Sequence, residues 1–223
     1  MTGLQFVVAH AVKLGLLVLL VGIVRRGRLG QCWSFAAYAL AILLGNSLVS
    51  FWPSRFYNSS FWLVKQAAYD TLKIAVALEL AWRAFRAFPG AMRTARLAVL
   101  IVLAASTCAL ALLTPARSYT TLWAWQPAVT TASLWLLTAT ALMVVWFQVP
   151  LLDWQRAIML GLAPYLLVYV VFFDLLRRRG WALLSPLATS ETLAYLALVV
   201  FWAWAAWQPA PARSAAGIRE AAA

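Results

Sequence analysis

The ionisable residues within apolar stretches of this sequence are its candidates for chemistry, and two stretches near the N-terminus contain most of them. The stretch from Phe61 to Phe85 reads FWLVKQAAYDTLKIAVALELAWRAF, and its ionisable side chains are Lys65, Asp70, Lys73, Glu79 and Arg83. A charged group at the centre of a bilayer costs at least about 2.5 kcal/mol. Charges kept at that depth pair with one another, line a water-filled cavity, or hold a ligand, an ion or a proton.

Helical spacing gathers most of these polar groups on one face. At about 100° per residue, Lys65, Asp70 and Lys73 fall on one broad arc of a helix, together with Tyr69. The other side of this helix is apolar. The sequence therefore predicts a helix that is amphipathic within a membrane, with its polar face turned toward other helices or a wet cavity.

Spacing along the helix also predicts two ion pairs. Asp70 and Lys73 lie three residues apart near the middle of the stretch, so an internal pair is feasible. Glu79 and Arg83 lie four residues apart with the acid first, which favours a local structural pair. Lys65 and Arg83 are close enough to the two membrane boundaries to extend toward the head groups.

The first apolar stretch adds His10 and Lys13, which lie three residues apart on one helical face. Lys13 falls near the middle of the membrane by residue count. Lys13, Asp70 and Lys73 would then meet there, and one of the two lysines would lack a carboxylate. A dry site would either make that lysine easier to deprotonate or recruit an anion. The candidate intramembrane polar site comprises these three residues with His10 and Tyr69. Further polar partners on later spans are Asn46, Ser47, Tyr165, Tyr169, Asp174, Glu191, Thr192 and Tyr195.

Three roles remain open for this polar site. The groups can join helices by giving each intramembrane polar atom a partner, they can form a ligand, ion or proton site, or they can form an enzyme active site. The sequence contains no HExxH, GxSxG, P-loop or CxxC motif, and its single histidine and scattered acids lack metal-ligand spacing. Neither a catalytic residue, a metal nor a cofactor is predicted.

Composition places the chain in a membrane. Its 223 residues are 65% hydrophobic and 11% charged, and the mean hydropathy is +0.85. A soluble domain is usually about half apolar and a quarter charged. The formal charge of +12 comes from arginines in the gaps between apolar runs, which is typical of topology signals and lipid head-group contacts. A lipid bilayer is therefore the expected partner, and nucleic acid is not.

The apolar runs predict an all-α membrane protein, a bundle of seven transmembrane helices. Each run has roughly the length that a helix needs to cross about 30 Å of hydrocarbon. The predicted spans are about Gly3 to Val24, Gln31 to Phe51, Phe61 to Phe85, Leu97 to Thr114, Pro127 to Phe147, Ala157 to Leu176 and Ser190 to Trp207. Residues 1–207 then form one transmembrane domain, and residues 208–223 a short disordered cytoplasmic tail.

The arginines favour an orientation with the N-terminus outside and the C-terminus inside. Short loops on the inner side of a membrane are enriched in Arg and Lys. In this orientation most arginines lie inside: Arg25, Arg26, Arg28, Arg86, Arg93, Arg96, Arg156, Arg213 and Arg219. The triplet Arg177–Arg179 disagrees, because it then lies at the outer head groups unless the sixth span is not a simple crossing.

One part of the chain resembles known bacterial proteins. An Arg-rich turn and an outer loop with Tyr and Phe precede YDTLKIAVALELAWRAFRAFPGAMRTAR, which starts at Tyr69. This arrangement resembles small multi-pass bacterial membrane proteins of no assigned function. It is also similar to the seven-span sensor regions that precede some bacterial histidine kinases. The resemblance covers about a third of the chain, implies a bacterial inner-membrane protein and transfers no catalytic residue.

Two functions follow as hypotheses. No output domain follows the last predicted span, so we expect a non-enzymatic, sensor-like or accessory module that acts through a membrane protein partner or as a homo-oligomer. The alternative is a small transporter or channel-like protein that uses Lys13, Asp70 and Lys73 as a site in the middle of the membrane. An intramembrane enzyme is the third possibility.

Overall fold

The computed structural model describes residues 3–85, 119–149, 151–179 and 184–209. Within these residues the secondary structure is helical and contains no strand. The predicted all-α fold class is therefore confirmed for this part of the chain. The fourth predicted span, about Leu97 to Thr114, and residues 210–223 of the predicted tail lie outside the described residues.

Six long helices make up most of the described chain, and their bounds follow the predicted spans closely at most ends. The largest difference is in α6, which begins eight residues before Pro127. The elements are α1 (Gly3–Arg25), the 3₁₀ turn η1 (Leu29–Gln31), α2 (Trp33–Phe51), the short α3 (Pro53–Phe56), α4 (Ser59–Phe85), α6 (Tyr119–Trp146), α7 (Asp153–Arg179) and α8 (Leu184–Trp207).

Four of the described helices are long and apolar enough to cross a membrane. They contain the segments Phe6–Arg25, Trp33–Phe51, Asp153–Leu176 and Leu187–Trp207. Helix α4 is not among them because of its five ionisable side chains, and the apolar part of α6, Thr130–Trp146, is shorter. The structure thus fits a membrane protein, while α4 can lie among apolar helices only if its polar face is covered.

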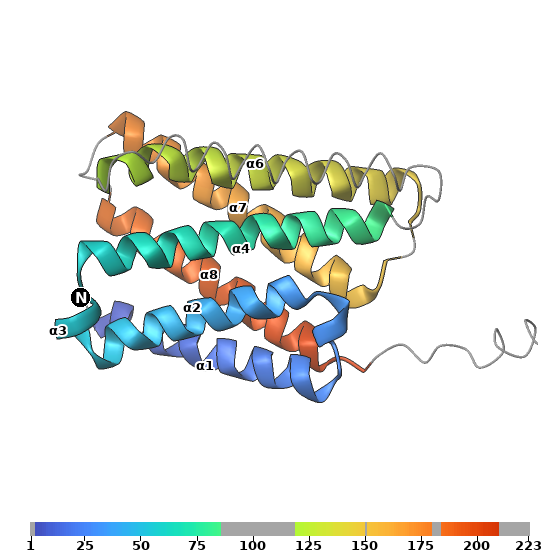
Figure 1. The fold of residues 1–223 in the computed structure, drawn as a ribbon, viewed down its shortest axis with the longest axis horizontal. Coiled ribbons are helices and arrows are strands. Elements are labelled where there is room, and N and C mark those ends of the chain that lie inside the picture. The colour runs from blue at the N-terminus through green and yellow to red at the C-terminus, as the bar shows by residue number, and fades with distance from the viewer. Residues whose placement is uncertain (1–2, 86–118, 150, 180–183, 210–223) are drawn as a thin grey trace, which may run out of the picture.

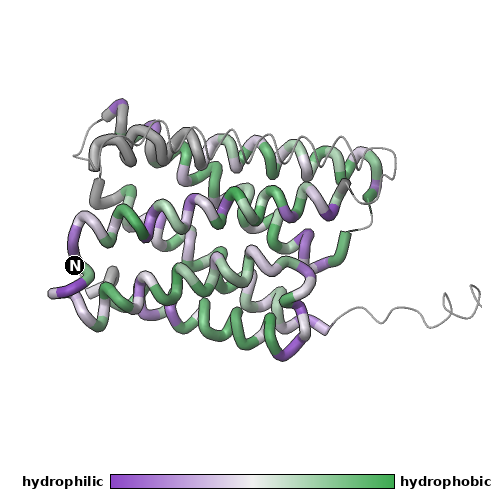
Figure 2. Tube along the Cα trace, viewed as in Figure 1, coloured by the Kyte–Doolittle hydropathy of each residue, from purple (hydrophilic) through white to green (hydrophobic). Residues whose placement is uncertain are grey.

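The long helices run side by side along the longest axis of the molecule (Figure 1). Helix α8 packs against α1 and α7, and α4 packs against α2 and α6. The chain starts at the same end of the bundle as α3 and the first turn of α4; we call this the N-terminal end and the other the opposite end. Purple, hydrophilic positions recur along α4, whereas α1 and α8 are mostly green (Figure 2).

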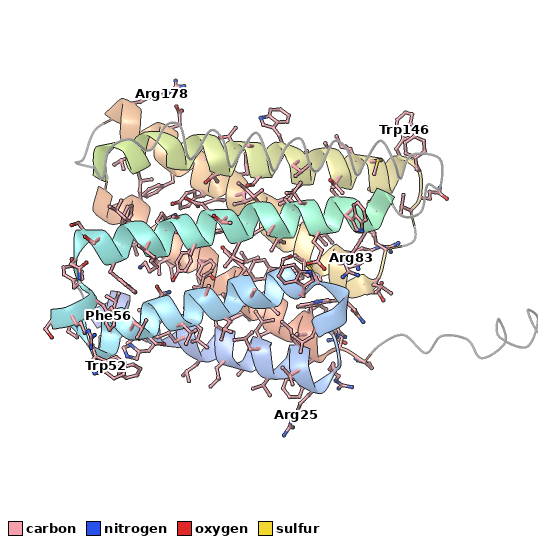
Figure 3. The ribbon with its side chains drawn as sticks, in the orientation of Figure 1. Arg25, Trp52, Phe56, Arg83, Trp146 and Arg178 are labelled. Atoms are coloured by element: carbon pink, nitrogen blue, oxygen red, sulfur yellow. The ribbon has the colours of Figure 1, made fainter. Side chains whose placement is uncertain are left out.

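Side chains at the two ends differ from those in the middle. Trp52 and Phe56 lie at the N-terminal end, whereas Arg25, Arg83 and Trp146 lie at the opposite end (Figure 3). Aromatic and basic side chains are favoured at the two surfaces of a bilayer. Arg178 lies at the N-terminal end (Figure 3), so the predicted mismatch of the Arg177–Arg179 triplet with the orientation rule remains.

The half of the bundle toward the opposite end is closely packed and apolar. Phe35 lies edge-on to Trp154 and Trp202, with ring centroids 5.5 Å and 4.7 Å apart. Around these rings lie side chains that are less than 2% exposed: Leu16, Leu19, Val76, Leu80, Ile158, Leu162 and Val199. We call these residues, with Phe35 and Trp202, the dry core.

Small residues let the helices around the dry core approach closely. A Cβ atom on Gly161 of α7 would lie 2.5 Å from the Trp202 indole nitrogen and 2.6 Å from a methyl group of Leu198. Both neighbours are buried on α8, so they have little room to move. Gly161 is therefore needed for the contact between α7 and α8.

We predict that Gly161→Leu lowers the free energy of unfolding by about 1–3 kcal/mol, the usual cost of overpacking. The matched control is Gly30→Leu, because nothing lies within 4 Å of a Cβ at Gly30. The control should stay within about 0.5 kcal/mol of the parent protein. Denaturant titration followed by tryptophan fluorescence measures both, and equal losses would contradict this account of α7–α8 packing.

Candidate binding cavity

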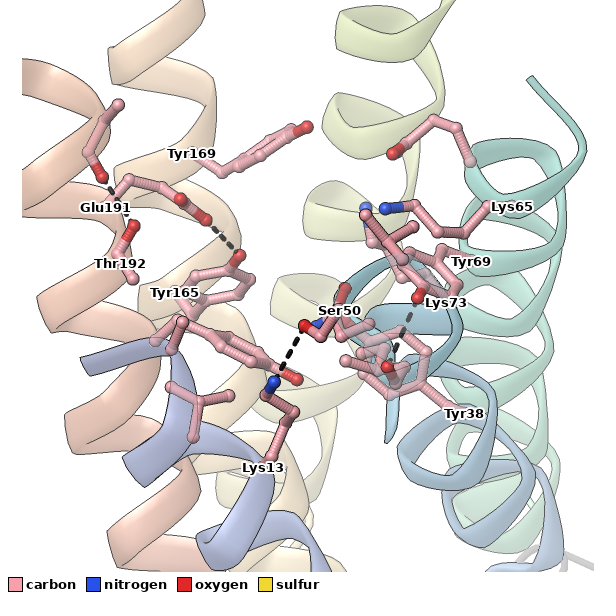
Figure 4. Close-up of a pocket in the computed structure, with 18 residues that line it drawn as sticks. Lys13, Tyr38, Ser50, Lys65, Tyr69, Lys73, Tyr165, Tyr169, Glu191 and Thr192 are labelled. Carbon is pink, nitrogen blue, oxygen red and sulfur yellow. Dashed lines mark hydrogen bonds between the residues drawn. The ribbon is translucent and has the colours of Figure 1, made fainter. Parts of the chain in front are cut away.

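A cavity of about 550 Å³ lies among five helices, and Figure 4 shows its lining residues. On α1 and α4 these residues precede those of the dry core, so the cavity lies between the dry core and the N-terminal end. Five of the seven tyrosines of the chain line it, together with three lysines and one glutamate. The titratable and aromatic lining residues are Lys13 of α1, Tyr38 of α2, Lys65, Tyr69 and Lys73 of α4, Tyr165 and Tyr169 of α7, and Glu191 and Tyr195 of α8. An apolar bundle thus encloses a polar chamber.

Helix α4 contributes a buried ion pair at the edge of this cavity. Lys73 Nζ lies 2.9 Å from Asp70 Oδ1, and the two side chains are only 6% and 9% exposed. Gln66 donates to the same carboxylate oxygen at 3.2 Å, and the Lys73 ammonium lies 5.0 Å from the centre of the Tyr169 ring. The charge of Lys73 is therefore compensated by Asp70 and by an aromatic face.

Lys13 lines the same cavity, but Asp70 is not its partner. Its ammonium donates to Ser50 Oγ of α2 at 2.8 Å and lies 5.9 Å from the centre of the Phe51 ring. The structure thus brings Lys13 and Lys73 to one cavity without joining Lys13, Asp70 and Lys73 into a single cluster. No carboxylate of the described residues pairs with Lys13.

Lys65 is a third cation on the cavity wall. Its ammonium lies 5.8 Å from the centre of the Tyr69 ring, and no carboxylate in the described part of the chain forms an ion pair with it. The stem of Lys65 runs close to the backbone of α2, where Gly45 leaves room for it. The sequence placed Lys65 on the polar face of this helix and close enough to the membrane boundary to reach the head groups; in the structure it lies on the cavity wall.

The remaining two predicted site residues lie differently. The Tyr69 hydroxyl lines the cavity and donates to the Ile42 carbonyl oxygen at 3.4 Å. His10 is exposed and does not line the cavity; its Nδ1 lies 2.9 Å from the Phe6 carbonyl oxygen one turn earlier. The geometry thus separates His10 from the other four members of the predicted site.

The wall formed by α7 and α8 carries the only carboxylate that lines the cavity among the described residues. Glu191 Oε1 accepts a hydrogen bond from the Tyr165 hydroxyl at 2.7 Å. The Tyr165 ring centroid lies 5.2 Å from that of Tyr195 and 6.2 Å from that of Tyr169. Within the described part of the chain, the buried Tyr195 hydroxyl has no hydrogen-bond partner, which is costly.

Comparison of the chain with family models, curated proteins and solved structures gives no match. The cavity is therefore interpreted from its own chemistry. Three lysines and one glutamate line it, and with adjacent Asp70 the formal sum is +3 − 2 = +1. No group of three or more potential His, Cys, Asp or Glu metal ligands occurs among the described residues. This lining suits an organic ion better than a metal.

At the opposite end, Glu79 joins two helices. Its carboxylate pairs with Arg83 at 2.6 Å and accepts hydrogen bonds from the Ser34 and Trp33 backbone N–H groups at 2.9 Å and 3.3 Å. Those N–H groups belong to the first turn of α2, where a helix leaves donors unpaired and favours a negative charge. Arg83 also donates to the Gly30 carbonyl oxygen at 2.9 Å. The i, i+4 spacing indicated the pair, but nothing in the sequence indicated this cap.

Arg28 makes a second link at the same end. Its guanidinium donates to the carbonyl oxygens of Ala205 and Gln208, which end α8, and lies 5.4 Å from the centre of the Trp154 ring. A cation at a helix C-terminus satisfies carbonyl groups that the helix leaves free. Burial lowers the pKa of Arg28, and the nearby charge of Arg26 lowers it further; an arginine still stays charged in proteins.

We predict that Glu79→Gln lowers the free energy of unfolding by about 1.5–3 kcal/mol, the range for hydrogen bonds to a charged group. Asp174→Asn is the matched control, since Asp174 and Arg178 form another i, i+4 pair but are 51% and 73% exposed. The control should cost no more than about 1 kcal/mol. Chemical denaturation in detergent compares the two; a Glu79→Gln loss no larger than the control loss would exclude the capping role.

Cys32 gives a second prediction at this end. The side chain of Cys32 is buried, with only 1% of the residue exposed, and its thiol donates to the Glu79 carboxylate at 3.6 Å. A buried thiol is out of reach of maleimides, which react with accessible thiolates. In a Cys108→Ser background, Cys32 should stay unlabelled in the folded protein and react within minutes in denaturant, as read by mass spectrometry. Rapid labelling of the folded protein would contradict this burial.

Proposed function

We propose that this protein is a multi-pass membrane receptor that binds a small organic anion in the cavity and acts through a membrane partner. The observation that carries the proposal is the pair of lysines, Lys13 and Lys65, that face the cavity without a carboxylate partner among the described residues. Their charges are compensated only by a hydroxyl group and by aromatic faces.

The charge balance of the cavity supports an anionic ligand. Lys13 and Lys65 are each partly exposed, and an ammonium group on a cavity wall is stabilised more by an opposite charge than by a neutral hydroxyl. Lys73 already has Asp70, so Lys13 and Lys65 are the groups that an anion would neutralise. The cavity volume of about 550 Å³ lies within the roughly 300–1,000 Å³ range of small-molecule sites.

The dry core favours a receptor over a channel. It fills the bundle between the cavity and the opposite end with side chains such as Phe35, Leu80 and Trp202, all less than 2% exposed. An ion channel requires a polar path across the whole membrane, whereas this cavity reaches only about half of the bundle. A ligand held there can change the packing of α4 and α8, and a partner can detect that change.

For topology we propose seven spans in the inner membrane of a bacterium, with the N-terminus outside. The cavity lies toward the N-terminal end of the bundle, so the ligand would enter from outside the cytoplasm. The helix-end contacts made by Glu79 and Arg28 would then lie on the cytoplasmic side.

The binding proposal predicts that Lys65→Gln and Lys13→Gln each weaken anion binding about tenfold or more, because each removes one cation, and a tenfold change is about 1.4 kcal/mol. The probes are benzoate, phenylphosphate and succinate, titrated calorimetrically into the protein in lipid nanodiscs. Arg178→Gln, which removes an exposed cation outside the cavity, is the control and should change nothing. Absence of binding for all three probes would overturn the proposal.

A small transporter is the second candidate, and the buried pair of Asp70 and Lys73 beside the cavity favours it. A transporter would use that carboxylate to carry a proton, so Asp70→Asn would abolish proton-coupled flux in proteoliposomes and leave the fold intact. For a receptor we expect no flux in the parent protein. Asp70→Asn should then lower the free energy of unfolding by about 3–5 kcal/mol, because it leaves Lys73 buried without its partner.

A further inference from the structure

The cavity has two walls of opposite chemical character, and this polarity restricts the ligand beyond its being an anion. Figure 4 shows Glu191, Thr192 and Tyr165 on one side of the chamber and Lys65 and Ser50 on the other, with Lys13 reaching in from α1. The first wall belongs to α7 and α8, and the second to α1, α2 and α4. We call them the acidic wall and the basic wall.

The acidic wall has the composition of a site for an ammonium group. It combines one carboxylate, Glu191, with the rings of Tyr165, Tyr169 and Tyr195, whose neighbouring centroids lie 5.2–6.2 Å apart. Aromatic faces grouped in this way attract organic cations, and alkylated ammonium groups most of all. Tyr165 engages one oxygen of Glu191, and Glu191 lines the cavity, so its carboxylate is in reach of a ligand.

Tyr195 contributes mainly its ring to this wall. The residue lines the chamber and is 9% exposed, whereas its hydroxyl is buried and has no hydrogen-bond partner among the described residues. Because the hydroxyl is itself inaccessible, the ring is the part of Tyr195 that a ligand in the chamber would contact.

The basic wall supplies the complementary charge. Among the described residues, Lys65 is compensated by the Tyr69 ring, and Lys13 by the Ser50 hydroxyl and the Phe51 ring. A carboxylate or phosphate between Lys13 and Lys65 would accept charge-assisted hydrogen bonds from their ammonium groups. We therefore infer, on the basis of the proposed binding function, that the ligand is a zwitterion whose ammonium group lies at Glu191 and the tyrosines and whose anionic group lies at Lys13 and Lys65.

Two matched probes test this inference. Trimethylglycine carries both charges, and 3,3-dimethylbutanoate has the same shape and carboxylate but a neutral carbon in place of the ammonium nitrogen. We expect trimethylglycine to bind at least about tenfold more tightly in phosphatidylglycerol nanodiscs. Glu191→Gln should abolish that difference, whereas Lys65→Gln should weaken both ligands alike. Tyr165→Phe, which removes one partner of Glu191 and keeps the ring, replaces Glu191→Gln if that variant does not fold, and should reduce the difference.

Each outcome separates this inference from the proposed function. Equal binding of the two probes, or a preference for the neutral analogue, would overturn the zwitterion and leave the anion site standing. Binding of benzoate without binding of trimethylglycine would do the same. If no anion binds, both proposals fail. The same charges occur in a phosphocholine head group, so phosphatidylcholine is added to the nanodiscs. If phosphatidylcholine weakens the binding of trimethylglycine, a lipid head group is a source of the ligand. If it does not, the ligand is a soluble molecule.

Discussion

The constraint on which the rest of this structure depends is that the polar face of α4 has to be covered. Asp70 and Lys73 pair at 2.9 Å and are almost completely buried, as charges among apolar helices must be. Helices α2 and α6 pack against α4, and Tyr169 of α7 lies over the Lys73 ammonium. Helices α1, α2, α7 and α8 also bring polar side chains to the chamber that α4 lines. The polar face of α4 therefore forms part of the cavity wall. The positive charge of the cavity comes from Lys65 of α4 and Lys13 of α1.

The opposite half of the bundle supplies rigidity. The dry core packs aromatic rings edge-on around Phe35, and close contacts at Gly161 bring α7 against α8. Glu79 satisfies the first turn of α2 and Arg28 the last turn of α8. These contacts hold the ends of α2 and α8 in place at the opposite end of the bundle. Movements on ligand binding are therefore expected in the halves of α4 and α8 that line the cavity. The proposed receptor function rests on this combination of a polar chamber and a closely packed base.

Local pairs and helix lengths could be predicted from the sequence, whereas contacts between distant segments could not. The pairs of Asp70 with Lys73 and of Glu79 with Arg83 follow from three- and four-residue spacing. The partner of Lys13 is Ser50, 37 residues away, and the cap by Glu79 joins residues 45 apart, so neither is visible in a helical period. The sequence signal for the acidic wall is weak: Tyr165 and Tyr169 lie four residues apart, as do Glu191 and Tyr195, which places each pair on one helical face. Proline was a poor boundary marker, because α6 begins at Tyr119 and contains Pro127.

The central claim is that a polar chamber opens toward the N-terminal end of the bundle and closes at the dry core. Cysteine accessibility in sealed membranes tests it most directly, in a chain with Cys32→Ala and Cys108→Ser. Asn46→Cys and Thr192→Cys line the chamber, and Leu16→Cys and Val199→Cys lie in the dry core. We predict that a charged, membrane-impermeant thiol reagent added outside labels the first two within minutes and leaves the last two unlabelled. Labelling of all four at similar rates, or of none, would contradict the account.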